Sequence, residues 1–197
     1  MERKLKPIFV ERLLREKAIR LFSPEEFRRL FGVTRRASQE FIKDHTQDLL
    51  LKLRNGLYAL RTEPPSDLEI ANRLYGPSYV SFEYALAFYQ VIPETVYTVT
   101  SATTKITREF EVLGRSYEYS RIKKEAYTGY RLTKVSGAEA LVATPEKALV
   151  DYCYFVDLRL KSLNERLRVK KLKAREILRC ARLFNRPSLL KLIREIL

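Results

Sequence analysis

The Asn55-Gly56 dipeptide lies between two apolar segments, residues 49–53 and 57–60, and it constrains the fold more than any other feature of the sequence. Both turn positions of a two-residue hairpin loop favour positive φ, which Asn and Gly adopt readily. The pattern therefore predicts a β-hairpin over residues 49–61.

Two helices are predicted in front of this hairpin. Residues 8–18 carry apolar side chains at helical spacing, which predicts an amphipathic helix. Ser23 and Glu26 have the spacing of a capping box, and Pro24 between them suits the first helical position. The second helix is expected to end at Gly32. The positions expected to face inward are Ile8, Phe9, Leu13, Leu14 and Ala18 in the first helix and Phe27, Leu30 and Phe31 in the second.

A third helix begins two residues after Gly32, with Thr34 as its cap, and is predicted to run to about residue 46. Two helices joined by a tight, glycine-containing turn form a helix-turn-helix. Followed by a hairpin, they predict a winged helix-turn-helix domain over residues 1–62. Ala37, Phe41 and Ile42 are expected to face inward, and Arg35, Arg36, Ser38, Gln39 and Lys43 outward.

Two arginines at the start of the third helix favour a DNA contact. Arg35 and Arg36 lie in its first turn, where each cation opposes the helix dipole by about 0.3–1 kcal/mol. A duplex phosphate or a guanine edge at this helix end explains them, although two exposed arginines can also tolerate so small a penalty. The candidate DNA contacts are Thr34, Arg35, Arg36, Ser38, Gln39 and Lys43 on the helix and Lys52, Arg54 and Arg61 on the hairpin.

The hairpin cations have a second interpretation, because charged side chains also protect the edge of a sheet against aggregation. The distribution of charge favours the first. The formal net charge is +14, of which residues 1–61 carry +7, residues 62–156 carry −2 and residues 157–197 carry +9. Basic ends around a near-neutral middle indicate a polyanionic partner, whereas a uniformly solvated basic surface is the alternative.

The sequence after residue 62 predicts a second, α+β domain over residues 66–197. Glu63-Pro64-Pro65 has the composition of a stiff linker. Ser66 and Glu69 form another capping box, Ser81 is expected to cap a helix, and Thr144-Pro145 to begin one. Segments rich in Thr, Val and Tyr predict strands of a small antiparallel or mixed sheet over residues 95–101, 106–113, 115–122, 130–135 and 139–143.

Several short motifs follow one another in this part of the chain. They are Asn55-Gly56-Leu57-Tyr58, Gly76-Pro77-Ser78-Tyr79-Val80-Ser81 with Ala85-Leu86, Pro93-Glu94, Tyr97-Thr98-Val99-Thr100, Gly129-Tyr130 and Ala143-Thr144-Pro145-Glu146-Lys147-Ala148-Leu149-Val150-Asp151. In this order, behind a winged helix-turn-helix, the sequence from about residue 19 to 156 resembles the AbiEi-type antitoxins of type IV toxin–antitoxin systems.

This resemblance implies a transcriptional autorepressor whose N-terminal domain binds inverted repeats in the promoter of its own operon. It also implies that the C-terminal domain counteracts a nucleotidyltransferase-like toxin, without the need for a stable complex. Some relatives resemble lone regulators without a toxin, so a plain winged-helix regulator is the alternative function.

Residues 157–197 match no motif of that family and are predicted to form two or three helices. Six cations occur within ten residues of this segment, between Arg166 and Arg175. A second contact with DNA or RNA is one interpretation, with Arg168, Lys170, Lys171 and Lys173 as its residues, and an RNA-binding factor is the corresponding function. A solvated helix face is the other.

The sequence contains no recognisable catalytic constellation, and we expect neither an enzyme nor a cofactor nor a metal site. The single histidine, His45, is far in sequence from Cys153 and Cys180, which lie among apolar helix residues. Glu146 and Asp151 have no evident acid–base partner. The longest apolar run has six residues, and no apolar segment follows the first residues, which predicts a cytoplasmic protein that does not enter a membrane.

Overall fold

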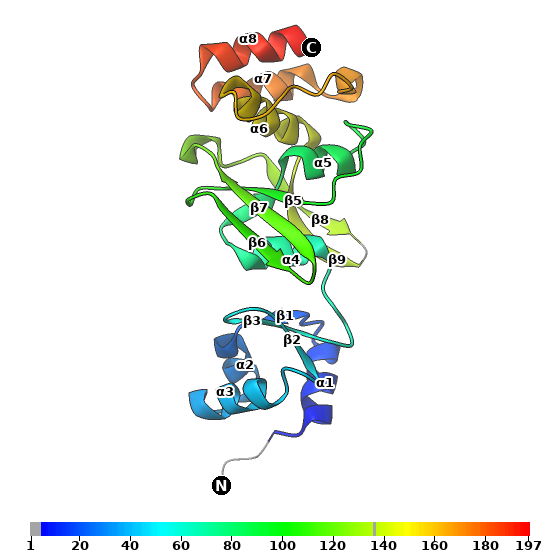
Figure 1. The fold of residues 1–197 in the computed structure, drawn as a ribbon, viewed down its shortest axis with the longest axis vertical. Coiled ribbons are helices and arrows are strands. Elements are labelled where there is room, and N and C mark those ends of the chain that lie inside the picture. Colours follow the sequence, from blue (N-terminus) through cyan, green and yellow to red (C-terminus); the bar gives the residue numbers. More distant parts are fainter. Residues whose placement is uncertain (1–4, 136) are drawn as a thin grey trace. The chain divides into compact units, whose positions relative to one another are not determined.

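The computed structural model describes residues 5–135 and 137–197, which form an α+β fold (Figure 1). Within these ranges the chain has eight α-helices and two sheets, one with three strands and one with six. It divides into two compact units, Met1–Leu74 and Tyr75–Leu197. None of the helices in the described ranges has the length and apolar character needed to span a membrane.

The first unit packs helices against a three-stranded antiparallel sheet with the strand order β1-β3-β2. The hairpin predicted at Asn55-Gly56 is confirmed, with Gly56 at a φ of +80°. Its elements are α1 (Pro7–Glu16), β1 (Leu21–Phe22), α2 (Pro24–Phe31), α3 (Arg35–Asp44), β2 (Leu50–Arg54), β3 (Leu57–Leu60) and α4 (Asp67–Leu74).

The predicted helix ends of this unit are confirmed. The Ser23 hydroxyl accepts from the Glu26 backbone N–H at 3.2 Å, and the Glu26 carboxylate accepts from the Ser23 N–H at 2.7 Å. Gly32 ends α2 in the left-handed region, at a φ of +61°. The Thr34 hydroxyl accepts from the Ala37 N–H at 3.2 Å and so caps α3.

Three aromatic rings connect the elements of the first core. Phe27 of α2 lies 5.6 Å from Phe22 of β1 and 5.4 Å from Phe41 of α3, measured between ring centroids. The inward positions predicted for the first helix are wrong at Ile8 and Phe9, which are 77% and 42% exposed. The prediction is also wrong at Ala18, which is exposed because α1 ends at Glu16. The other members of this core are Val10, Leu14, Ile42, Leu49, Leu50 and Leu60.

The second unit is built on a six-stranded mixed sheet with the order β6-β7-β5-β4-β9-β8. The pairs β4–β9 and β5–β7 are parallel, and the remaining neighbours are antiparallel. The strands are β4 (Ser78–Val80), β5 (Val99–Thr103), β6 (Arg108–Val112), β7 (Arg115–Arg121), β8 (Tyr130–Val135) and β9 (Ala138–Ala143).

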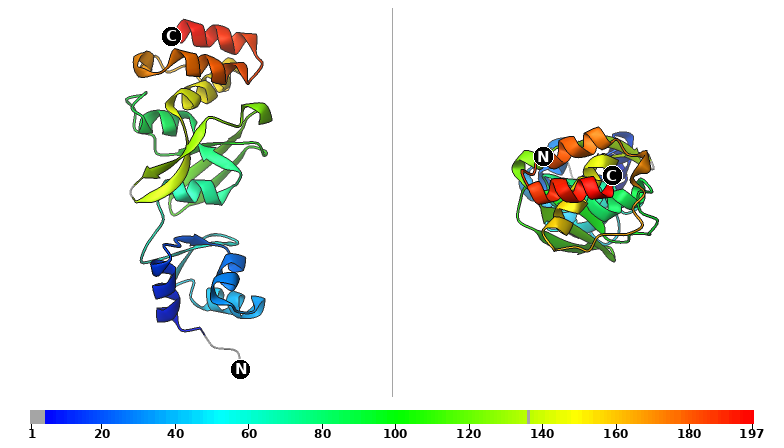
Figure 2. Two further views of the ribbon diagram at one scale, coloured as in Figure 1. Left: turned by 180° about the vertical axis from the view of Figure 1, so that it is seen from behind. Right: turned by 90° about the horizontal axis from the view of Figure 1, so that it is seen from above.

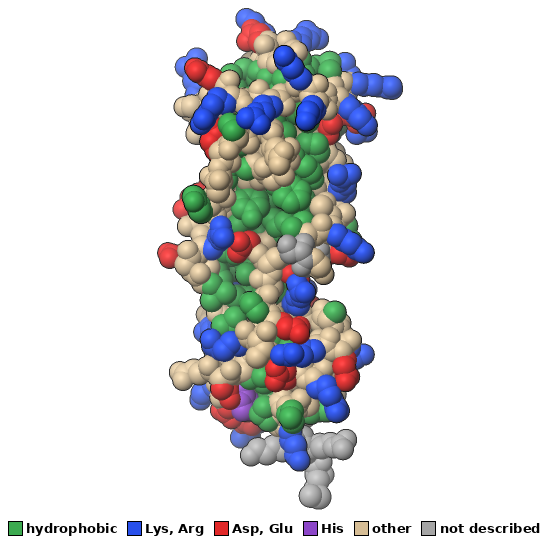
Figure 3. Space-filling view, turned by 90° about the vertical axis from the view of Figure 1, so that its right-hand side faces the viewer, with side chains coloured by type: hydrophobic (Ala, Val, Ile, Leu, Met, Phe, Trp, Pro, Cys, Tyr) green, Lys and Arg blue, Asp and Glu red, His purple; other side chains and the backbone are tan. Residues whose placement is uncertain are grey.

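Helices cover one side of this sheet. Figures 1 and 2 show α6 (Pro145–Asp157) between the sheet and the pair α7 (Ala174–Arg182) and α8 (Pro187–Ile196), with α5 (Phe82–Phe88) beside α6. On the face drawn in Figure 3, Lys and Arg side chains gather over the end that α7 and α8 form. The predicted helical C-terminal end is thus present, and Thr144 caps α6 as expected, accepting from the Lys147 N–H at 3.3 Å.

One predicted cap is wrong. Ser81 precedes α5, but its side chain makes no capping hydrogen bond and instead donates to Asp151 at 2.7 Å. The Thr100 hydroxyl, from β5, accepts from the Tyr84 N–H at 3.1 Å in its place. The reason is that the carboxylate of Asp151 is fully buried and requires hydrogen-bond donors.

Candidate nucleic-acid interface

The exposed side of α3 consists of two stripes of side chains with different charge. Arg35, Gln39 and Lys43 are spaced four residues apart and are all exposed, so they follow one another along the helix. The adjacent stripe, which begins at Arg36, contains Glu40 and Asp44 and is therefore mainly acidic.

A hollow of about 320 Å³ lies between the first stripe and the hairpin. Lys52 of β2 lines it together with Gln39 and Lys43, so the structure brings these three predicted contacts to one place. The floor and the other walls are formed by Pro24, Ile42, Thr46 and Tyr58. Two amines and an amide around a shallow depression form a surface that can hydrogen-bond to phosphate or base oxygens.

Arg36 differs from Arg35 in its surroundings. The Arg36 guanidinium donates to the Glu40 carboxylate at 2.8 Å, across one helical turn. Arg35, by contrast, has no ion pair with any residue that the structure describes, and the same holds for Lys43 and Lys52. The cations around the hollow are thus available to an external anion, whereas Arg36 already has an internal one.

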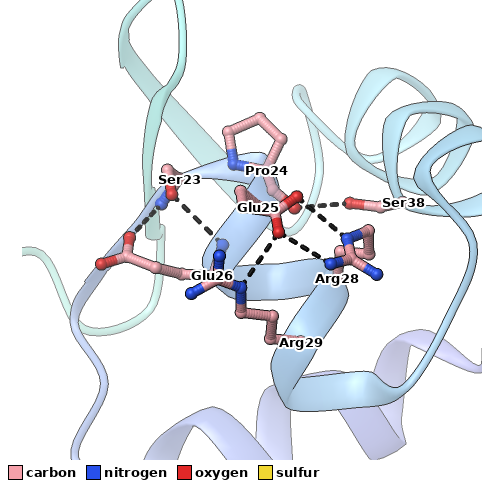
Figure 4. Close-up of polar contacts among 7 residues, drawn as sticks. All are labelled: Ser23, Pro24, Glu25, Glu26, Arg28, Arg29 and Ser38. Carbon is pink, nitrogen blue, oxygen red and sulfur yellow. Dashed lines mark hydrogen bonds and ion pairs between the residues drawn. The ribbon is translucent and has the colours of Figure 1, made fainter.

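The cations of α2 are also paired (Figure 4). Arg28 donates to both oxygens of Glu25, at 2.9 and 2.7 Å, and Arg29 donates to the same carboxylate at 3.0 Å. These hydrogen bonds lower the pKa of Glu25 to about 2. In α1, Arg12 and Arg15 likewise lie next to glutamates.

The expectation that Ser38 faces outward is wrong. Its side chain is 1% exposed, and its hydroxyl donates to the Pro24 carbonyl at 3.0 Å (Figure 4). Position 38 lies between the inward positions 37, 41 and 42 on the helix, so it faces α2. Ser38 therefore holds α3 against α2, and its side chain is not available at the surface.

Two hairpin arginines bind backbone carbonyls. Arg54 donates to Asn55 in the turn at 2.9 Å. Arg61 donates to the carbonyls of Thr46 and Leu50, at 3.4 and 3.3 Å, and so links the segment after α3 to the hairpin. Both side chains remain exposed. The hydrogen bonds of Arg61 to these carbonyls give this residue a structural role that requires no contact with DNA.

The basic segment of the second unit is not the face of an α-helix. Lys170 and Lys171 lie on a short 3₁₀ turn, η2 (Val169–Lys171), and Lys173 immediately precedes α7. Arg168 lines a hollow of about 610 Å³ beside Tyr84 and Phe88 of α5. All four predicted cations of this segment, Arg168, Lys170, Lys171 and Lys173, are exposed.

The second unit contains a buried polar cluster that sequence reasoning missed. Lys147 and Asp151 of α6 are both fully buried and form an ion pair. Asp151 also accepts from the Tyr79 hydroxyl at 2.9 Å and from Ser81. Burial raises the pKa of Asp151, against the opposing effect of Lys147 and the hydrogen bonds. The available signal was two opposite charges four residues apart within an apolar helical run.

Burial or contacts within the chain give the remaining candidate residues of the sequence a structural role. Burial raises the pKa of Cys153 to about 12, which keeps its thiol protonated. His45 packs on Phe41, at 4.4 Å between ring centroids, and lies 3.0 Å from Asp48. Glu146 accepts from the Lys173 N–H at 3.3 Å. Among the described residues there is no group of three or more His, Cys, Asp or Glu that could hold a metal ion.

No protein-family model matches the chain, and no curated protein matches it significantly.

Proposed function

We propose that the chain is a DNA-binding transcriptional regulator whose residues 1–62 form a winged helix-turn-helix. In this assignment α3 enters the major groove and the β2–β3 hairpin is the wing. The observation that carries the proposal is the row of Arg35, Gln39 and Lys43 along α3, of which Gln39 and Lys43 line one hollow together with Lys52 of the hairpin. All four side chains are exposed, and the three cations among them have no carboxylate partner within the described chain.

These side chains have distinct roles in the proposed complex. Arg35 and Gln39 have the functional groups that read guanine and adenine edges in the major groove. Lys43 and Lys52 bind phosphates on either side of the hollow. Ser38 holds α3 against α2, and Arg36 contributes less than Arg35 because Glu40 neutralises it.

The partner is double-stranded DNA, and the resemblance to AbiEi-type antitoxins supports an operator with inverted repeats in the chain's own promoter. Such a regulator acts in the cytoplasm as an autorepressor.

The test measures binding of the full chain to a duplex from its own upstream region by fluorescence anisotropy at several salt concentrations. We expect Arg35→Ala to weaken binding by about 1–3 kcal/mol and to relax sequence preference. Lys52→Ala should weaken binding to all sequences alike and reduce the salt slope by about 1.

Arg12→Ala is the matched control, because Arg12 is another exposed arginine of the same unit that lies beside Glu16 and does not line the hollow. It should bind like the unmodified chain. If Arg35→Ala bound the promoter duplex as tightly as Arg12→Ala, α3 would not be the reading helix.

A second candidate function is neutralisation of a nucleotidyltransferase-like toxin by the second unit. The observation that favours it is that two segments carrying the resemblance, residues 76–81 and 143–151, meet in the hydrogen bonds of Tyr79 and Ser81 to Asp151. Co-expression of the Arg35→Ala chain with the product of the adjacent gene separates this function from DNA binding. Rescue of growth supports it, and growth arrest that the chain does not relieve contradicts it.

A further inference from the structure

A second hollow in the Tyr75–Leu197 unit is basic, and neither the resemblance nor the proposed function assigns it a role. It has a volume of about 640 Å³, within the range of small-molecule sites. Three cations and one carboxylate line it, Arg121, Lys123, Lys124 and Glu125. The other lining residues are Thr104, Ile122 and Tyr154.

The hollow lies at the carboxyl ends of two parallel strands. β5 ends at Thr103 and β7 at Arg121, and the two strands pair in parallel, so that Thr103 is opposite Arg121 (Figure 1). Thr104 and residues 121–125 therefore follow both strands out of the sheet at the same edge. In open sheets this edge, outside the carboxyl ends of parallel strands, is where ligands bind.

The cations that line the hollow differ in the contacts that they make within the chain. Lys123 donates to the Phe184 carbonyl at 2.5 Å, which fixes its amine at the wall. The side chains of Arg121 and Lys124 are exposed and make no hydrogen bond or ion pair with any residue of the described ranges. Several cations of the C-terminal segment of the same unit do pair with carboxylates, among them Arg166 with Glu94 and Arg186 with Asp157.

The remaining wall supplies a ring in a fixed position. The Tyr154 ring packs on Phe184, with 4.4 Å between centroids, so its orientation is set by α6 and by the segment between α7 and α8. Its hydroxyl has no hydrogen-bond partner in the part of the chain that the structure describes. Ile122 beside it is buried. The hollow thus combines an anion-binding side with a hydroxyl and an aromatic edge.

We infer that this hollow binds a nucleoside phosphate, with the phosphate on Arg121 and Lys124 and the base beside Tyr154. An arginine and a lysine supply charge-assisted hydrogen bonds to phosphate oxygens. The volume exceeds what inorganic phosphate alone would fill, which is why a larger phosphate ester is assigned. The inference does not depend on DNA binding by α3, since all of its residues belong to the second unit.

The test is isothermal titration calorimetry of the full chain with AMP, with inorganic phosphate and with a 5′-phosphorylated pentanucleotide. We expect AMP to bind, phosphate to bind more weakly, and the affinity for AMP to fall about tenfold or more in Arg121→Gln/Lys124→Gln. If the pentanucleotide binds more tightly than AMP and competes with it, the ligand in the cell is the end of a nucleic acid. If AMP is the tighter ligand, it is a free nucleotide.

The matched control is Arg131→Gln/Lys134→Gln, which removes the same two charges from exposed positions of β8, outside the hollow. This variant should bind AMP like the unmodified chain. The inference is overturned if AMP does not bind at millimolar concentration, or if both double variants lose affinity equally, because the effect would then come from net charge alone. Promoter binding, measured on the same variants, reports separately on the DNA-binding proposal.

Discussion

The two units of this protein use polar residues in opposite ways. Among the described residues of the Met1–Leu74 unit, Ser38 is the only buried polar side chain, and no charged side chain is fully buried. In the described part of the Tyr75–Leu197 unit, seven polar or charged side chains are buried, including both partners of an ion pair: Ser78, Ser81, Thr100, Ser101, Thr103, Lys147 and Asp151.

The polar residues of the two units therefore have different roles. In the first unit, local caps and an apolar core determine the fold, and the charged side chains of Arg35, Lys43 and Lys52 have no ion pair with a described residue. In the second unit, several motif residues are buried and contact one another there, because buried polar groups are stable only when they are hydrogen-bonded. The motif residues of the second unit therefore indicate, first of all, side chains that stabilise its fold.

The strongest test of this contrast is Lys147→Met, which leaves Asp151 buried without its cation. We expect a loss of about 3–5 kcal/mol in the free energy of unfolding of the second unit, measured by urea denaturation. The double variant Lys147→Met/Asp151→Leu should recover much of that loss, since the uncompensated charge is then gone. A single variant as stable as the unmodified chain would show that the pair is not buried in solution.

A smaller effect is expected from Thr100→Val, which removes a hydroxyl while keeping the shape of the side chain. Thr100 donates to the Ser81 carbonyl at 2.7 Å and accepts from the Tyr84 N–H, so two backbone groups lose a partner. The expected destabilisation is about 1–3 kcal/mol, read from the same denaturation curves. Hydrogen exchange at the start of α5 should increase; unchanged exchange there would contradict the capping role.

Ser38→Ala is the corresponding change in the first unit. It removes one hydrogen bond, from the Ser38 hydroxyl to the Pro24 carbonyl, and we expect a destabilisation of about 1 kcal/mol. Promoter affinity should stay unchanged under conditions where the variant is folded, because Ser38 does not reach the surface. A loss of affinity in the fully folded variant would return Ser38 to the set of DNA contacts.

The smallest effect concerns Glu25, whose side chain is exposed. Its pKa of about 2 lies below the ordinary 4.5 because the carboxylate is paired with Arg28 and Arg29. The stabilisation of α2 by this pairing is therefore complete at pH values above 4.5. That contribution is lost as the pH falls through 2. NMR titration should therefore show Glu25 titrating near 2, and Glu25→Gln should be slightly less stable than the unmodified chain at pH 7 but equal to it below pH 2. A midpoint near 4.5 would contradict the pairing.

Much of the fold could be predicted because the signals are local. The capping box at Ser23, the left-handed Gly32 and the Asn55-Gly56 turn act through neighbouring residues. The candidate site was predictable only in part. Arg35, Gln39 and Lys43 were placed correctly by helical spacing, whereas Ser38 was misplaced because a short polar side chain does not reveal which neighbour covers it.

The sequence alone determined the α+β class, most of the helices and strands and the basic character of both ends, since propensity, capping and charge are properties of the chain itself. It did not determine the short strands β1 and β4, which are held by pairing with distant strands. Only the tertiary structure decided which charges are neutralised. It pairs Arg36 but not Arg35 with a described carboxylate, and it buries Lys147 with Asp151. It also brings Arg121 and Lys124 to the open edge of a parallel strand pair. These outcomes depend on which residues come into contact from distant segments of the chain. The free energy of a charged side chain depends on the distance to its partner and on how far water is excluded from the pair.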